Sequence, residues 1–128
     1  MLANFSIDVD PARSVVRITL GGFFGAADVT SFAQAQMKAY AALPKTAERH
    51  LTLCDISACK IQLQDVVDAF RRLLDDPALM SRRIAFVTGN SPAKMQIRRM
   101  VNRDTARAFE RAEDAERWLL ACETRAAA

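Results

Sequence analysis

The alternation of short strand-like segments with longer amphipathic segments constrains the fold of this chain most. Residues 5–10 and 15–20 alternate apolar and polar side chains, which is typical of β-strands with one wetter face. Asp10 and Pro11 favour a turn between them, so the two segments are expected to form an antiparallel hairpin. Residues 83–88 are apolar on both sides, as in a central strand with both faces covered.

Four further segments repeat apolar residues at helical spacing, and each follows a strand. The expected helices cover residues 26–43, 62–75, 91–103 and 113–122, the remaining strands cover 50–57 and 105–109, and residues 124–128 form a frayed tail. Ser91 and Pro92 are the expected N-cap and first position of the third helix. The order predicts one α/β domain, residues 1–128, with a mixed, mostly parallel five-stranded sheet that opens with an antiparallel hairpin.

Composition excludes several classes of protein. Apolar residues make up 51% and charged residues 26% of the 128 residues, so a disordered chain is not expected. No segment approaches the roughly 18 apolar residues of a membrane span, and residues 1–4 lack the basic start of a signal peptide. Three cysteines are too few for a disulfide framework in a chain of this length, so a cytoplasmic location is expected.

Candidate catalytic and metal-binding residues are few. His50 is the single histidine, and Cys54 on the same strand lies roughly 13 Å away in extended chain, so no Cys–His pair is expected. Cys54, Cys59 and Cys122 do not have the spacing of a zinc site. The glycine motifs of phosphate-binding, dinucleotide-binding and serine-hydrolase sites do not occur. We therefore predict no enzyme activity, no cofactor, no metal and no nucleophile–base pair around His50.

Basic residues gather in one part of the chain. Residues 82–111 hold eight basic and two acidic side chains, yet they carry no aromatic stacking pattern or reading motif for nucleic acid. Ser91 and Lys94 lie where the loop 88–94 enters a helix, which favours an anion-binding turn or, alternatively, an ordinary capped loop. Met95 points away from the apolar stripe of that helix, beside Arg98 and Arg99, as in a surface that contacts an acidic partner or an anionic membrane.

Phe23 and Phe24 lie in a loop flanked by glycines. They indicate contact with an apolar ligand or a membrane, unless one or both rings fold into the core. The polar face of the first two strands leaves an exposed sheet face or a homodimer contact open.

Several segments together resemble the STAS family, the anti-sigma-factor-antagonist fold, and in particular its SpoIIAA-like branch. They are the opening hairpin, Asp55-Ile-Ser57, Arg83-Ile-Ala-Phe-Val, and Ala108-Phe-Glu followed by Ala115-Glu-Arg-Trp-Leu. The resemblance implies a non-enzymatic regulatory module that binds a protein partner, such as a kinase-like or sigma-regulatory factor. Phosphoregulated members begin the following helix with a Ser or Thr, but residues 62–65 have no hydroxyl, and Ser57 is the nearest one. The alternative is a carrier of a small apolar or amphiphilic ligand at an anionic membrane surface.

Overall fold

The computed structural model describes residues 2–43, 49–101 and 103–127, and for residues 122–127 the backbone alone. The elements are β1 (Asn4–Asp10), β2 (Val15–Gly22), α1 (Ala26–Ala41), β3 (Leu51–Cys59), α2 (Gln64–Asp75), a 3₁₀ turn (Pro77–Leu79), β4 (Arg83–Val87), α3 (Lys94–Met100), β5 (Ala106–Phe109) and α4 (Ala112–Ala127). The predicted order of strands and helices is therefore confirmed.

The strands form one mixed sheet with the order β1-β2-β3-β4-β5. The pair β1–β2 is antiparallel with Ile7 opposite Ile18, and the three pairs from β2 to β5 are parallel. Each parallel pair is joined by a segment that contains a helix, because parallel neighbours need a crossover connection. The predicted hairpin and mostly parallel sheet are thus confirmed.

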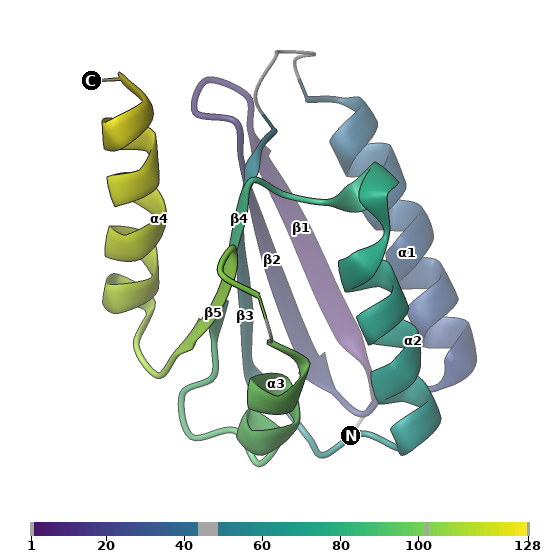
Figure 1. The fold of residues 1–128 in the computed structure, drawn as a ribbon. Helices are drawn as coiled ribbons and strands as arrows, with labels where there is room; N and C mark the ends of the chain where they lie inside the picture. The colour runs from purple at the N-terminus through teal and green to yellow at the C-terminus, as the bar shows by residue number, and fades with distance from the viewer. Residues whose placement is uncertain (1, 44–48, 102, 128) are drawn as a thin grey trace.

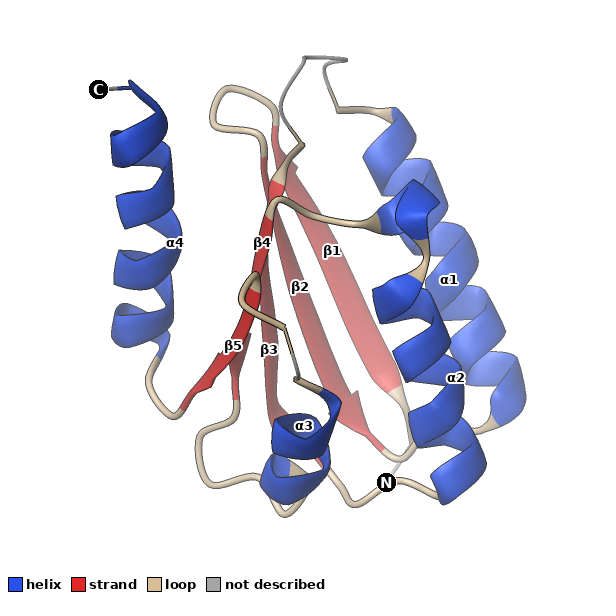
Figure 2. Ribbon diagram, in the orientation of Figure 1, coloured by secondary structure: helices blue, strands red, loops and turns tan. Residues whose placement is uncertain are grey.

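Helices cover both faces of the sheet, as Figures 1 and 2 show. α1, α2 and α3 lie on one face, and α4 lies on the other. Strand β4 serves both sides, since Ile84 and Phe86 join the core beneath α1–α3 while Ala85 and Val87 pack toward α4. This position explains why β4 is apolar on both sides, because alternate residues of a strand face opposite layers.

Some element boundaries differ from the prediction. The third helix was expected over 91–103, but α3 covers Lys94–Met100 only. Ser91 does not begin it, because the Ser91 Oγ accepts from the Ala93 N–H at 3.0 Å within a turn that precedes the helix. In the other direction, α4 continues to Ala127 instead of ending at residue 122. Fraying of residues 124–127 stays a prediction, and residue 128 lies outside the described residues.

Candidate functional site

Gln62, between β3 and α2, forms hydrogen bonds that connect its own loop with the β2–α1 loop at one end of the sheet. Its Oε1 accepts from the Phe24 N–H at 2.8 Å, and its Nε2 donates to the carbonyls of Gly22 at 3.0 Å and Lys60 at 2.5 Å. Phe24 and Gly22 belong to the segment that leads from β2 into α1, so one side chain satisfies backbone groups far away in the sequence. Such buried backbone groups need partners, because leaving them unpaired is costly.

The backbone of Gln62 also holds α3 in place. Its N–H donates to the Gln96 Oε1 at 2.9 Å, and its carbonyl accepts from the Gln96 Nε2 at 2.8 Å. We call these contacts of Gln62 with Gly22, Phe24, Lys60 and Gln96 the Gln62 junction. It joins the segments that follow the carboxyl ends of β2, β3 and β4, which lie together near the N-terminus in Figure 1.

Exposed apolar side chains surround the Gln62 junction. Of the seven large apolar side chains that are exposed among the described residues, five lie at this end of the sheet: Leu2, Phe23, Ile61, Leu63 and Met95. Four of them are sequence neighbours of Phe24, Gln62 or Gln96, and Leu2 forms an isolated β-bridge with Phe23. Scattered apolar residues are ordinary on a protein surface, but a cluster of this kind is typical of an interaction site.

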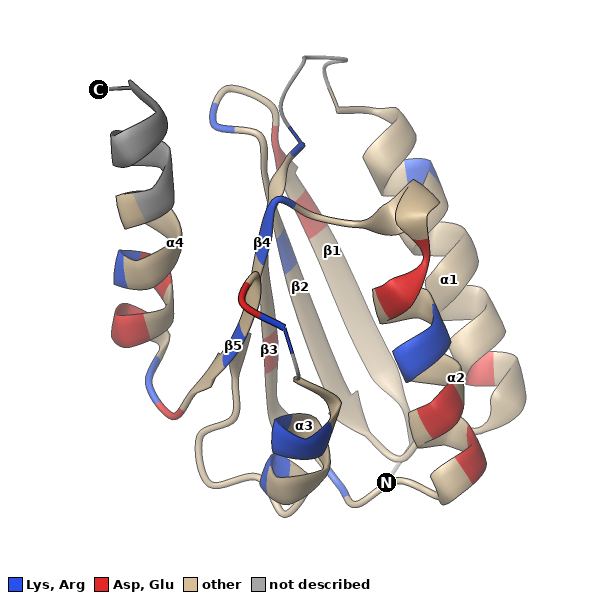
Figure 3. Cartoon of the chain, in the orientation of Figure 1, with Lys and Arg blue, Asp and Glu red and all other residues tan. Residues whose placement is uncertain are grey.

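Unpaired basic side chains lie on the same end of the molecule. Arg98 and Arg99 on α3 are exposed and form no ion pair with a described residue, and Lys60 is exposed beside Ile61. Figure 3 shows the basic residues of α3. We define the carboxyl-end surface as Leu2, Phe23, Lys60, Ile61, Leu63, Met95, Arg98 and Arg99. It combines an apolar cluster with basic side chains, of which Arg98 and Arg99 form no ion pair with a described residue, at the edge where open α/β sheets most often bind ligands.

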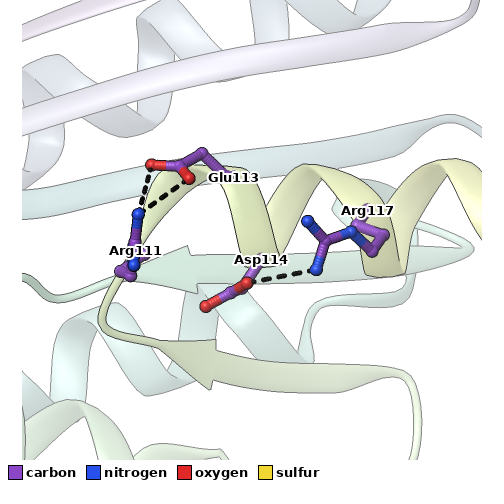
Figure 4. Close-up of polar contacts among 4 residues, drawn as sticks. All are labelled: Arg111, Glu113, Asp114 and Arg117. Atoms are coloured by element: carbon purple, nitrogen blue, oxygen red, sulfur yellow. Dashed lines mark hydrogen bonds and ion pairs between the residues drawn. The ribbon is translucent and has the colours of Figure 1, made fainter.

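Several other cations in the second half of the chain form ion pairs with nearby carboxylates. Lys94 forms an ion pair with Glu110. The Lys94 ammonium, with a smaller effect from Arg98, holds the pKa of the Glu110 carboxyl below its usual range. On and just before α4, Arg111 pairs with Glu113 at 2.9 Å and Arg117 with Asp114 at 3.4 Å, as Figure 4 shows. Of the basic residues of α3, Arg98 and Arg99 are thus the two that are exposed and form no ion pair with a described residue; Arg107 on β5 is also exposed but lies over the rings of Phe109 and Trp118.

The structure confirms the predicted exposure of Met95 but not the predicted accessibility of Ser91. Met95 is 56% exposed, as expected from its position opposite the helix stripe. Ser91 cannot contact a partner, because it is buried and its hydroxyl donates to the Cys59 carbonyl at 2.7 Å. Nor does the loop present an anion cradle, since its N–H groups at Gly89, Ser91 and Lys94 already donate to carbonyls.

Ser57 lies near the carboxyl end of β3, beside the loop that leads to α3. It is exposed inside β3, and its N–H donates to the Asp55 Oδ1 at 2.8 Å. A Cβ added to Gly89 would lie 3.0 Å from the Ser57 Cβ, which places Ser57 beside the β4–α3 loop. The hydroxyl therefore sits on a strand, not at the helix start where phosphoregulated STAS proteins carry theirs.

The two phenylalanines of the β2–α1 loop have different environments. Phe23 is 41% exposed on the carboxyl-end surface, whereas Phe24 is buried and its ring meets Phe70 edge-on at 5.4 Å between centroids. The prediction of a membrane contact is wrong for Phe24, because its ring packs beneath α2. Phe24 instead lines a cavity.

This cavity lies between the sheet and helices α1, α2 and α3, with a volume of about 90 Å³. Its walls are almost entirely apolar and include Phe24, Phe32, Phe70, Ile97 and Met100. Three glutamines complete the lining: Gln62 and Gln96, whose amides are bonded in the Gln62 junction, and Gln36 of α1. No described lining residue carries a charge.

A chain of polar side chains leads away from Gln36 toward His50. The Gln36 Nε2 donates to the Tyr40 Oη at 3.1 Å, and that hydroxyl lies 3.4 Å from the Thr52 Oγ1. The Thr52 Oγ1 lies 2.6 Å from the Ser81 Oγ, which in turn lies 3.1 Å from the His50 Nε2. We call this row of five residues the polar chain. It gives His50 a hydroxyl neighbour that spacing along the sequence did not indicate, because parallel pairing of β3 and β4 brings Ser81 beside it.

The contact between His50 and Ser81 does not resemble an open nucleophile–base site. Ser81 is 6% exposed and shares its hydroxyl with Thr52. Burial, with the nearby Arg49 charge, lowers the pKa of His50 to about 4, so the imidazole is neutral near pH 7. Burial also raises the pKa of the Cys59 thiol to about 12 and that of Cys54 well above its usual range. Neither thiol is activated as a nucleophile.

Among the described residues, no helix is long and apolar enough to cross a bilayer, and no three His, Cys, Asp or Glu side chains gather as metal ligands.

Comparisons with known proteins identify the fold. A scan against protein-family models and a search of curated proteins give no match. Among solved structures, an uncharacterized DUF3478 protein of Shewanella loihica PV-4 with a SpoIIAA-like fold matches with a TM-score of 0.68 and 16% identity, over 93% of this chain and 96% of that one. An anti-sigma factor antagonist from Mycobacterium paratuberculosis matches with a TM-score of 0.57 and 15% identity, over 91% and 95%. The chain therefore has the SpoIIAA-like α/β fold that its sequence pattern resembles.

Proposed function

We propose that this protein is a non-enzymatic regulatory module that docks an acidic protein partner through the carboxyl-end surface. The observation that carries the proposal is the cluster of exposed apolar side chains beside the unpaired Arg98 and Arg99. Apolar contacts would supply most of the binding free energy, while the two guanidinium groups would select an acidic partner and speed its encounter. The similarity to an anti-sigma factor antagonist supports regulation by protein binding.

Docking would proceed without phosphorylation of the helix start. Gln64 and Asp65 occupy the first positions of α2, so no hydroxyl is present there. Phosphate on Ser57 would instead add negative charge on β3, outside the carboxyl-end surface. We therefore expect the partner to bind the unmodified chain.

The experiment compares two triple variants that remove the same side chains from different places. Met95→Ser with Arg98→Ala and Arg99→Ala changes the carboxyl-end surface, whereas Met37→Ser with Arg13→Ala and Arg72→Ala removes one exposed methionine and two exposed arginines elsewhere. All six positions are surface sites, so each variant should change the free energy of unfolding by no more than about 0.5 kcal/mol per position.

Proteins captured from cell extract by the wild type are identified and purified, and their Kd values are measured at two salt concentrations. We expect the first variant to weaken binding at least tenfold and to reduce its salt dependence, while the control binds like the wild type. Equal binding by both variants would contradict the proposed surface. Loss of binding to phosphatidylserine vesicles, without loss of any protein, would assign the surface to an anionic membrane instead.

A second candidate function is the carrying of a small apolar ligand, with docking at an anionic membrane as its delivery step. The specific observation that favours it is the cavity of about 90 Å³ lined by apolar side chains. Interiors are normally packed with few voids larger than a water molecule, so a space of this size is available to a ligand.

A further inference from the structure

We infer that the cavity beneath α2 and α3 binds a small neutral molecule with an apolar body and one hydrogen-bond donor, an alcohol or a phenol, whose hydroxyl donates to the Gln36 Oε1. The inference rests on the second candidate function, and it names the class of ligand. It does not depend on protein docking at the carboxyl-end surface.

Gln36 supplies an open acceptor inside an apolar space. Its side chain lines the cavity and is only 8% exposed, and its Oε1 is buried without a hydrogen-bond partner among the described residues. A buried carbonyl oxygen without a donor is unfavourable, because it has lost its water without gaining another bond. A ligand hydroxyl would restore the missing bond. The amides of Gln62 and Gln96, which also line the cavity, are hydrogen-bonded at both their oxygen and their nitrogen.

The polar chain accounts for which atom of the Gln36 amide is left without a partner. A neutral imidazole accepts at one ring nitrogen, so the Ser81 hydroxyl can donate to the His50 Nε2 at 3.1 Å. Thr52 and Tyr40 then donate successively toward Ser81, and the Gln36 Nε2 donates to the Tyr40 oxygen. With every donor directed toward His50, the amide oxygen of Gln36 is the atom left for a ligand.

The lining also limits the size and charge of the ligand. At roughly 10–15 Å³ for each water-sized group, a volume of about 90 Å³ holds about six to nine non-hydrogen atoms. A carboxylate or an ammonium ion would be buried without a counter-charge, because no described lining residue is charged. Fatty-acid anions and amines are therefore disfavoured, while neutral medium-chain alcohols and phenols fit.

The test uses three probes with the same number of non-hydrogen atoms: hexan-1-ol, 1-methoxypentane and heptane. Hexan-1-ol can donate a hydrogen bond, 1-methoxypentane can only accept one, and heptane can do neither. Titrations followed by amide chemical shifts of the full chain give each Kd. We expect hexan-1-ol to bind the wild type about threefold to tenfold more tightly than 1-methoxypentane, as one net hydrogen bond provides.

Gln36→Met removes the acceptor with little change in volume, and Gln34→Met is the matched control on the exposed side of the same helix. We expect Gln36→Met to lose the preference for hexan-1-ol while it retains 1-methoxypentane, and Gln34→Met to behave as the wild type. Both variants are checked by their amide spectra for the native fold.

Each outcome decides one point. Equal binding of hexan-1-ol and 1-methoxypentane to the wild type would overturn the role of Gln36 while keeping the ligand-carrying function. Failure of all three probes to bind would overturn both that function and the inference. A hexan-1-ol preference that survives in Gln36→Met would place the hydroxyl elsewhere and overturn the inference alone.

Discussion

The Gln62 junction makes a quantitative prediction about folding. Gln62→Leu keeps the approximate size of the side chain but removes its three hydrogen bonds, to the Phe24 N–H and to the carbonyls of Gly22 and Lys60. The backbone bonds to Gln96 involve main-chain atoms of residue 62, so the substitution leaves their donors and acceptors in place.

The expected loss follows from how well water can replace each bond. Lys60 is exposed, so its carbonyl can be hydrated in the variant, and the loss of that bond costs little. The N–H of the fully buried Phe24 loses its partner where water has poor access, at a cost of about 1–3 kcal/mol. The carbonyl of buried Gly22 keeps the Lys60 N–H as a donor at 3.1 Å, so the loss of its second bond costs less, about 0.5–1 kcal/mol. Burial of the leucine offsets part of this, so we expect Gln62→Leu to lower the free energy of unfolding by about 1–3 kcal/mol.

Urea unfolding followed by circular dichroism measures the difference, and Gln64→Leu is the control. Gln64 is exposed and its Nε2 donates only to the Asp68 Oδ1, at 2.9 Å, so its substitution should change stability by about 0.5 kcal/mol or less. Hydrogen exchange of the Phe24 amide should accelerate in Gln62→Leu by more than the loss in the free energy of global unfolding explains. If the two leucine variants are equally stable, the Gln62 junction does not hold these segments together.

Three further measurements test the interior. Folding lowers the pKa of His50 from 6.5 to about 4, because the folded chain favours the neutral imidazole. The contribution of His50 to the free energy of unfolding is therefore fully present above about pH 6.5 and is lost as the pH falls toward 4. After a discount for partial exposure, we expect His50→Gln to remove about 1–2 kcal/mol of that pH dependence, and equal pH slopes in urea unfolding would contradict it. In a Cys122→Ser background, Cys54 and Cys59 should react with a thiol reagent at pH 8 only when the chain unfolds; rapid reaction of the native protein would refute their burial. Gly89→Ala should cost about 1–2 kcal/mol in urea unfolding, because φ is +51° there and the new Cβ would lie 3.0 Å from a β3 side chain; an unchanged midpoint would count against it.

The elements and the exposed face of α3 were predictable because they depend on local periodicity. Met95 follows from helical spacing alone: it lies far around the helix from Ile97 and Met100, whichever other elements surround it. The positions of the first two strands follow equally from alternation, and the two-sided apolar pattern of β4 correctly predicted an interior strand of the sheet. The helix boundaries were predicted less accurately, since Ser91 is compatible both with a helix cap and with the turn that forms before α3.

The Gln62 junction and the polar chain could not be predicted in the same way. Gln62 meets Phe24 across 38 positions and Gln96 across 34, and no local pattern encodes such contacts. One signal was present: Gln62 is a polar residue between the apolar Ile61 and Leu63, which a helical stripe does not explain. For His50, the missing information was the parallel register of β3 and β4, which brings the segment before β4 to the amino end of β3.

The two proposed binding sites share supporting residues but differ in the residues that would contact each ligand. Mutation can therefore separate them. Gln62 and Gln96 line the cavity and also hold the loops that carry Phe23, Ile61, Leu63 and Met95. Arg98 and Arg99 do not line the cavity, and Gln36 is buried and does not belong to the carboxyl-end surface.

We therefore expect a double dissociation between the sites. Arg98→Ala with Arg99→Ala should weaken partner docking and leave the Kd of hexan-1-ol unchanged, whereas Gln36→Met should do the reverse. Gln62→Leu should impair both, because it disturbs the cavity wall and the surface at once. If Gln62→Leu affects docking alone, the cavity wall is held by the surrounding core rather than by the Gln62 junction, and the surface and the cavity are independent features of the fold.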